Sequence, residues 1–183
     1  MTRITRQICV MATVLVMVFT LILIGFARES RQRDEVSLII GDRIGTQPSF
    51  AVPDCLPLTR DSRAAEAAAT IAQVLWDDLD FEREFRMIPR DVYSTIPPAR
   101  SLIDLPFDRW QELGTDGVIS CTVAAVGDAQ IEVTARLFSV RSLESAFGVV
   151  YTGSSRNVRV YAHQLADEIH RHQRGLDGVA RTR

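Results

Sequence analysis

The three histidines of the chain are the residues whose chemistry is easiest to judge from sequence. His163, His170 and His172 all fall in one predicted helix near the end of the chain. His163 and His170 are spaced to share a helix face, as two metal ligands would be. They lack the i, i+4 pair of a zinc-protease helix, and no third ligand stands at a telling distance. The sequence therefore favours solvated histidines on a polar face over a metal site.

A group of acids closes the other long predicted helix, at Asp77, Asp78 and Asp80. Paired carboxylates can exchange protons when burial raises the pKa of one of them. Here we expect a solvated rim, or ion pairs with Arg83 and Arg86. No arrangement of Ser, Cys and His for a nucleophile stands out, and no glycine-rich phosphate loop occurs. The sequence thus predicts no enzyme and no cofactor.

Two amphipathic helices are predicted to position these groups. The first begins at a cap among Thr59, Asp61 and Ser62 and runs to about Asp80. Its apolar positions follow the helical period, at Ala64, Ala68, Ile71, Ala72, Val74, Leu75 and Leu79. The second runs over residues 157–173 and ends at Gly175, with Val158, Ala162, Leu165, Ala166 and Ile169 on one face.

Strands are predicted around these helices, over residues 35–40, 49–53, 85–89, 118–126, 131–140 and 147–152. Gly127 and Asp128 mark a hairpin turn between two of them. Asp108 is expected to cap a short helix that ends at Gly114. This order predicts an α/β fold of the α+β kind, a mixed sheet with packed helices.

An export segment precedes the domain. Residues 8–27 are almost continuously apolar and follow Arg3 and Arg6. This order is typical of a secretory signal, and we expect cleavage near Ala27. The run would also span about 30 Å as a helix, enough to cross a bilayer, so an uncleaved membrane anchor is the alternative. Either way the rest of the chain is expected outside the cytoplasm.

A short β-prone segment follows the export segment, at Glu35, Val36, Ser37, Leu38, Ile39 and Ile40. Such a strand can add to an exposed sheet edge of another protein through its backbone hydrogen bonds. It can equally pair within its own sheet. Both readings stay open from the residues alone.

The amino-acid composition limits the classes of partner that the chain is expected to bind. All 21 basic residues are arginine, and the net charge is −2. A mildly acidic chain with scattered arginines lacks the basic footprint of a nucleic-acid-binding protein. Cys55 and Cys121 are the thiols expected in the exported part. A disulfide between them is allowed outside the cytoplasm, but the sequence favours two separate buried thiols.

The ordered motifs of the chain resemble those of a known family, the TolB amino-terminal domain of the Tol–Pal cell-envelope system. The resemblance rests on residues 35–40, 50–53, 74–79, 135–138, 166–168 and the run Trp110-Gln111-Glu112-Leu113-Gly114-Thr115-Asp116-Gly117-Val118. It implies an anticodon-binding-domain-like α/β fold without catalytic residues. It also implies a periplasmic location and contact with a TolA-like inner-membrane protein through residues 35–40.

The resemblance divides the chain into a signal or anchor (1–27), an epitope strand with its linker (28–48), a TolB-like domain (49–175) and a linker end (176–183). In the family a β-propeller follows and carries the contact with Pal. No blade repeat occurs in this sequence, so we expect no Pal contact through it. The expected function is a periplasmic interaction module supporting envelope integrity and related protein transport. The alternative is a membrane-anchored structural domain of a truncated or split Tol-like protein.

Overall fold

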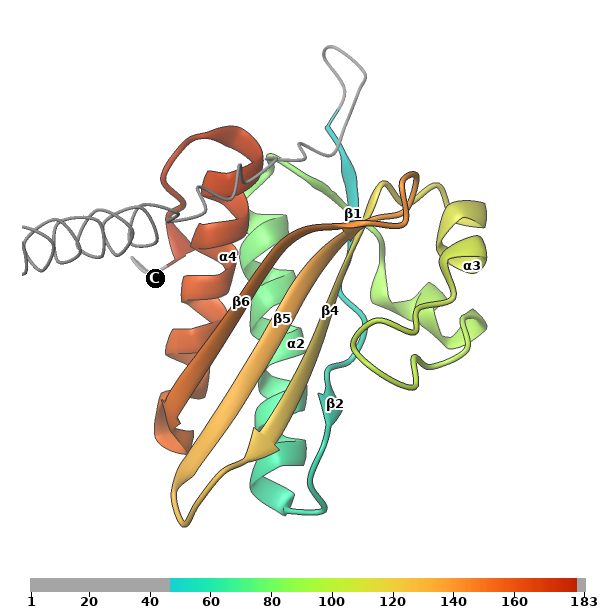
Figure 1. Ribbon diagram of the computed structural model, residues 1–183. Helices are drawn as coiled ribbons and strands as arrows, with labels where there is room; N and C mark the ends of the chain where they lie inside the picture. The colour runs from blue at the N-terminus through green and yellow to red at the C-terminus, as the bar shows by residue number, and fades with distance from the viewer. Residues whose placement is uncertain (1–46, 181–183) are drawn as a thin grey trace, which may run out of the picture. The chain divides into compact units, whose positions relative to one another are not determined.

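The fold is built on one mixed β-sheet, seen face-on in Figure 1. The structure is a computed structural model that describes residues 47–180, so the predicted export segment and the strand at 35–40 lie outside the described residues. The strand order is β3-β1-β4-β5-β6, and β2 also pairs with β4. The strands are β1 (Ser49–Ala51), β2 (Leu56–Pro57), β3 (Arg86–Met87), β4 (Gly117–Ala125), β5 (Gln130–Ser139) and β6 (Ser145–Ser154).

The sheet joins a parallel half to an antiparallel half. β1 pairs in parallel with both β3 and β4, and β2 pairs in parallel with β4. β4, β5 and β6 form an antiparallel meander. This arrangement confirms the predicted α+β class with a mixed sheet.

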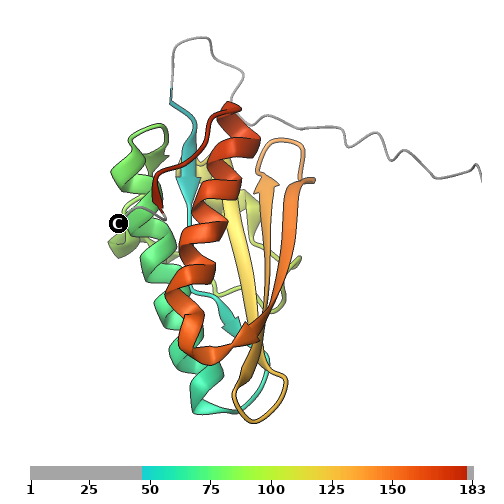
Figure 2. The same ribbon diagram turned by 90° about the vertical axis from the view of Figure 1, so that its left-hand side faces the viewer.

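Two helices cover one face of the sheet, as Figure 2 shows. They are α2 (Ser62–Glu82) and α4 (Val158–Arg174), the latter preceded by the short η2 (Ser155–Asn157). Both run in the same direction, because Asp78 and Glu82 of α2 face His163 and His170 of α4 in that order. Asp61 caps α2 through the Arg63 N–H, and Gly175 ends α4 at φ +69°, as predicted.

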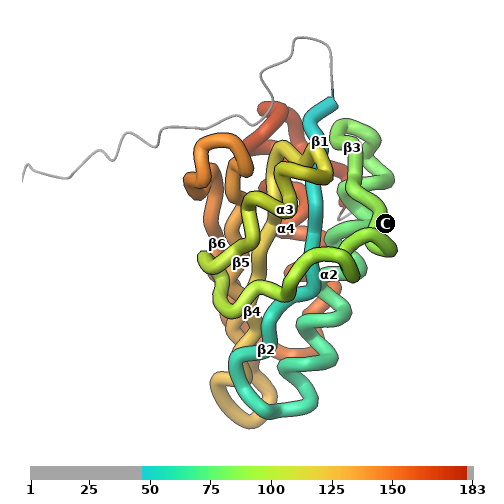
Figure 3. Tube along the Cα trace, turned by 90° about the vertical axis from the view of Figure 1, so that its right-hand side faces the viewer, coloured from blue at the N-terminus to red at the C-terminus, as the bar shows by residue number. Residues whose placement is uncertain are grey.

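An irregular segment covers part of the opposite face, where η1 (Arg90–Thr95) and α3 (Phe107–Glu112) lie (Figure 3). The predicted cap of α3 is wrong. Asp108 lies within the helix, and Pro106 stands at the cap position without a side-chain hydrogen bond. Gly114 does follow the helix with a φ of +68°, a left-handed conformation that glycine adopts without strain.

Apolar side chains form two separate cores, one on each face. The helix-side core lies under α2 and α4 and includes Phe50, Ile71, Leu75, Ile119, Leu137, Leu165 and Ile169. The loop-side core lies under η1 and α3 and consists of Ala51, Ile88, Ile96, Leu105, Trp110, Val118, Phe138 and Val140. Alternation along β4 divides the two, since Val118 points to one core and Ile119 to the other.

A disulfide joins Cys55 to Cys121, so the expectation of two separate thiols is wrong. The reason is β2, a strand too short and too proline-rich to be predicted. Its parallel pairing with β4 brings the two Cα atoms to 4.7 Å, within the range that a disulfide spans. Both cysteines are buried in the helix-side core.

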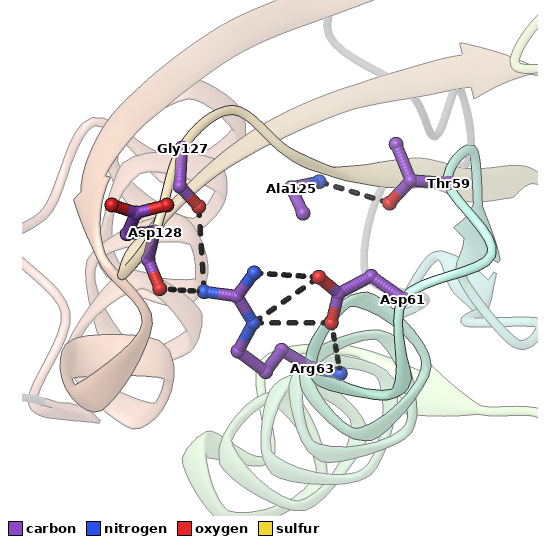
Figure 4. A network of polar contacts seen from close by, with 6 residues as sticks. All are labelled: Thr59, Asp61, Arg63, Ala125, Gly127 and Asp128. Atoms are coloured by element: carbon purple, nitrogen blue, oxygen red, sulfur yellow. Dashed lines mark hydrogen bonds and ion pairs between the residues drawn. The ribbon is translucent and has the colours of Figure 1, made fainter.

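Polar contacts fix the turn of the β4–β5 hairpin to the start of α2 (Figure 4). The Arg63 guanidinium donates to the carbonyl oxygens of Gly127 and Asp128 in the turn and is held by the Asp61 carboxylate. The Thr59 hydroxyl accepts from the Ala125 N–H at 3.1 Å.

Within residues 47–180, no helix is long and apolar enough to cross a membrane.

Candidate functional site

The first described residues anchor the chain where it enters the domain. The Ser49 N–H donates to the Asp116 carboxylate at 2.8 Å, and the Asp116 N–H donates back to the Ser49 carbonyl at 2.8 Å. Ser49 is fully buried. The Ser49 hydroxyl also lies 2.5 Å from the Gly114 carbonyl oxygen, to which it donates. The start of β1 is therefore held by several hydrogen bonds to the turn that precedes β4.

The end of α2 reinforces this anchor. Arg83 ends α2 in a left-handed conformation, with φ +56°, and its carbonyl oxygen accepts from the Gln47 side-chain amide. The Arg86 N–H donates to the Pro48 carbonyl at 2.9 Å. Gln47 is thus fixed to one corner of the sheet. The predicted partner-binding residues 35–40 lie outside the described residues, and residues 41–46 between them and Gln47 can span at most about 20 Å.

Acids and histidines meet between α2 and α4, contrary to the prediction that both groups face solvent. The Asp78 carboxylate is 2.6 Å from His163 Nδ1, and the Asp78 side chain is 2 % exposed. His170 is also buried and packs edge-on against the Phe85 ring. Asp77 and Asp80 do remain exposed, so only these two behave as the sequence predicted.

The helical period explains the burial. Asp78 follows Val74 and Leu75 by one turn, on the face that packs against the sheet. Asp167 and His170 likewise interleave with the buried residues Ala166 and Ile169 of α4. The acids and histidines were assigned to solvent from their chemistry alone, whereas their positions on the two helices indicated the interface.

Two carboxylates in this interface hold the chain that follows α4. The Glu82 carboxylate accepts from the Val179 N–H at 3.2 Å, and the Asp167 carboxylate accepts from the Ala180 N–H at 2.9 Å. Glu82 Oε2 lies 3.9 Å from His170 Nδ1. Burial is the main cause that raises the pKa of Glu82, opposed in part by His170. Sequence reasoning placed residues 176–183 in a linker and did not find this contact.

The side chains at this interface are suited to exchanging protons and to binding backbone N–H groups more than to breaking covalent bonds. Its carboxylates and imidazoles contact each other and backbone N–H groups, and no nucleophilic side chain lies in the contacts described. Among residues 47–180, no cluster of histidine, cysteine and carboxylate ligands has the arrangement to hold a metal ion.

Comparison with known proteins gives the chain a family context. Residues 36–145 match the model of the TolB amino-terminal domain, which covers more than half of the chain. The Tol-Pal system protein TolB of Nitrosococcus oceani is 30% identical over 112 residues, covering 61% of this chain and 25% of that protein. The protein of the same name from Jannaschia sp. is 32% identical over 136 residues, covering 73% of this chain and 29% of that one.

A solved structure supports the fold. The crystal structure of TolB from Acinetobacter baumannii aligns with a TM-score of 0.54 at 17% identity, covering 73% of this chain and 30% of that chain. This chain therefore spans only 25% to 30% of the length of these three relatives.

Proposed function

The chain belongs to the family of TolB amino-terminal domains, and we propose that it serves as a non-enzymatic protein-interaction module of the Tol–Pal type. The module would present residues 35–40 as a strand to a TolA-like inner-membrane protein in the periplasm. Its role would be to support the integrity of the cell envelope and the protein transport linked to it. The observation that carries the proposal is the family match, which begins at Val36 and so includes most of the predicted epitope.

The anchor at Gln47 and Ser49 supports this use of the N-terminal segment. A strand that binds a partner transmits force or position only if its far end is fixed to the domain. Ser49 and Asp116 exchange two hydrogen bonds, and Gln47 is bound to the end of α2. The chain therefore enters the described domain at a fixed point, Gln47, at one corner of the sheet.

The disulfide supports a location outside the cytoplasm. Cys55 and Cys121 form a buried disulfide, and such bonds persist in oxidising compartments such as the periplasm. The apolar run at residues 8–27 supplies a route of export. The two observations are independent, because one lies in the domain and the other precedes it.

The Ile39→Asp variant tests the proposal. A charge in the middle of the proposed strand should weaken its pairing with the partner, so capture of the periplasmic domain of TolA should fall about tenfold or more. Binding would be measured by titration with the purified exported chain. Ile103→Asp is the matched control, since Ile103 is 65% exposed in the loop before α3 and should leave capture unchanged. Equal binding by the wild type and Ile39→Asp would refute the proposal.

A further inference from the structure

The segment Gly178–Ala180, which we term the strap, lies against the groove between α2 and α4. Figure 2 shows the chain after α4 turning back over the two helices. One carboxylate from each helix binds it, Glu82 from α2 and Asp167 from α4. Ala180 is 1% exposed and belongs to the helix-side core. The strap is thus recognised through its backbone and one small side chain.

At Gly178 the strap approaches Asp167 and Glu82 so closely that its fit depends on the residue type at this position. A Cβ atom at this position would lie 2.4 Å from Asp167 Oδ1 and 2.8 Å from Glu82 Oε1. The Cβ atom would also lie 2.8 Å from the backbone Cα atom of Asp167, which cannot swing aside, so only glycine allows the strap to reach the two carboxylates. The groove therefore selects the sequence of the strap as well as its backbone.

Glu82 is the unusual member of this contact. Its side chain is 2% exposed. One carboxylate oxygen accepts from Val179, while the other is buried and has no hydrogen-bond partner among the described residues. The facing His170 also has both ring nitrogens buried without a hydrogen-bond partner there. An ionised carboxylate in such a place lacks the donors that would replace water.

We propose that docking of the strap takes up a proton at Glu82, so that the strap binds more tightly as the pH falls and loosens as it rises. Protonation removes the charge that the groove solvates poorly. The acid keeps a carbonyl oxygen that can accept from the Val179 N–H. This inference concerns the α2–α4 groove alone and is independent of which partner residues 35–40 bind.

The direction of this pH dependence follows from the thermodynamic linkage between proton binding at Glu82 and docking of the strap. Burial raises the pKa of Glu82 in the docked form, and release of the strap would admit water and return the pKa toward its ordinary value. The docked form then binds the proton more tightly than the released form. The stabilisation of docking is complete below the ordinary pKa of the released form and is lost as the pH rises through the raised pKa of the docked form.

The charged groups around Glu82 act on this balance from each element. Burial is the largest cause of the raised pKa of Glu82; Asp167 and Asp78 raise it further, while His170 and the hydrogen bond from the strap's Val179 N–H lower it. Asp78 lies 2.6 Å from His163, and Arg174 is paired with Glu84 at 3.1 Å beyond the groove. On the segment that leads to the strap, Asp177 pairs with Arg171. Of the carboxylates around the strap, Glu82 is thus the one that is buried with one oxygen lacking a hydrogen-bond partner among the described residues.

Amide hydrogen exchange of the intact chain tests the proposal. Protection factors for the Val179 and Ala180 amides, corrected for intrinsic exchange, should fall about threefold or more between about pH 5 and about pH 8. In Glu82→Gln, which mimics the protonated acid, protection at the higher pH should match that of the wild type at the lower pH. The dependence on pH should disappear.

Two further variants complete the test. Glu84→Gln makes the same change two residues on, where the side chain is 44% exposed, and should keep the wild-type profile. Gly178→Ala should remove protection at every pH while far-UV circular dichroism stays unchanged. Wild-type protection that is flat or rises with pH would overturn the proposal, as would an equal effect of Glu84→Gln. Should Glu82→Gln fail to fold, the wild-type profile alone decides.

Discussion

The two faces of the sheet are built by different means. The helix-side core is closed by two long amphipathic helices, and its buried residues recur at the helical period. The loop-side core is closed by irregular chain and one short helix, and aromatic rings supply much of its bulk. Trp110 packs edge-on against Tyr93, and Phe107 packs against Phe138.

Polar side chains also make different contacts on the two faces of the sheet. On the loop side, the Tyr93 hydroxyl donates to the Ile88 carbonyl at 2.9 Å and accepts from the Val52 N–H at 3.1 Å, so it ties irregular chain to the sheet. On the helix side, buried acids and histidines join two regular helices and the strap. The difference teaches that buried acids and histidines here join regular elements, whereas the irregular segment is tied to the sheet by a tyrosine hydroxyl and by the ion pair of Arg90 with Asp54.

The disulfide should give the largest effect and lies on the helix side. Replacing both Cys55 and Cys121 by serine should lower the free energy of unfolding by about 4 kcal/mol, the chain-entropy cost of freeing so long a loop. The two cysteines are separated by 66 positions in sequence. Urea unfolding monitored by circular dichroism gives the measurement.

Reduction provides the control for this prediction. Dithiothreitol should destabilise the wild type by a similar amount and leave the double serine variant unchanged. A wild type that responds no more than the variant would mean that the bond contributes little and that packing alone holds β2 against β4.

Leucine truncation compares the two cores with the same chemistry. Leu75→Ala, at a fully buried position under α2, should cost about 3 to 4 kcal/mol. Leu105→Ala should cost about 1 to 2 kcal/mol, because Leu105 is 8% exposed and an irregular loop can relax into the space. Leu105 also borders a cavity of about 160 Å³, so its removal enlarges a space that already exists. Equal losses of unfolding free energy, measured in urea, would show that the loop-side core relaxes around a deleted side chain no more than the helix-side core does.

The cap of α2 should give the smallest effect. Asp61→Ala removes the acceptor for the Arg63 N–H and the partner that holds the Arg63 guanidinium. We expect a loss of about 1 kcal/mol in unfolding free energy. Ser62→Ala, at the exposed neighbouring position, is the control and should change stability little. A cap effect near zero would show that packing against the helix-side core alone fixes the start of the helix.

Periodicity made the helix-side core predictable. Every apolar residue assigned to the inner face of α2 is buried, from Ala64 to Leu79. The β4–β5 hairpin was predictable for a similar reason, because Ile131, Val133, Ala135 and Leu137 alternate with less buried residues. Each of these signals is local and repeats within one element.

The loop-side core and the acid–histidine contacts depend on distant parts of the chain. Trp110 and Phe138 meet only when α3 folds across the sheet, and no period marks that crossing. Asp78 and His163 stand 85 positions apart, and Asp78 was assigned to solvent because single acids are usually exposed. β2 was missed because Pro57 argues against a strand, although an edge position tolerates it.

The common direction of α2 and α4 has an electrostatic consequence. Both helix dipoles place their negative ends at the same end of the domain, each equivalent to roughly half an elementary charge. The last turn of α2 carries no basic residue, whereas that of α4 carries Arg171, His172 and Arg174. Arg174 donates to the Glu84 carbonyl at 3.0 Å, just beyond the end of α2. Beside Arg83 at the C-cap of α2, the neighbouring helix therefore places a second cation near the negative pole of α2.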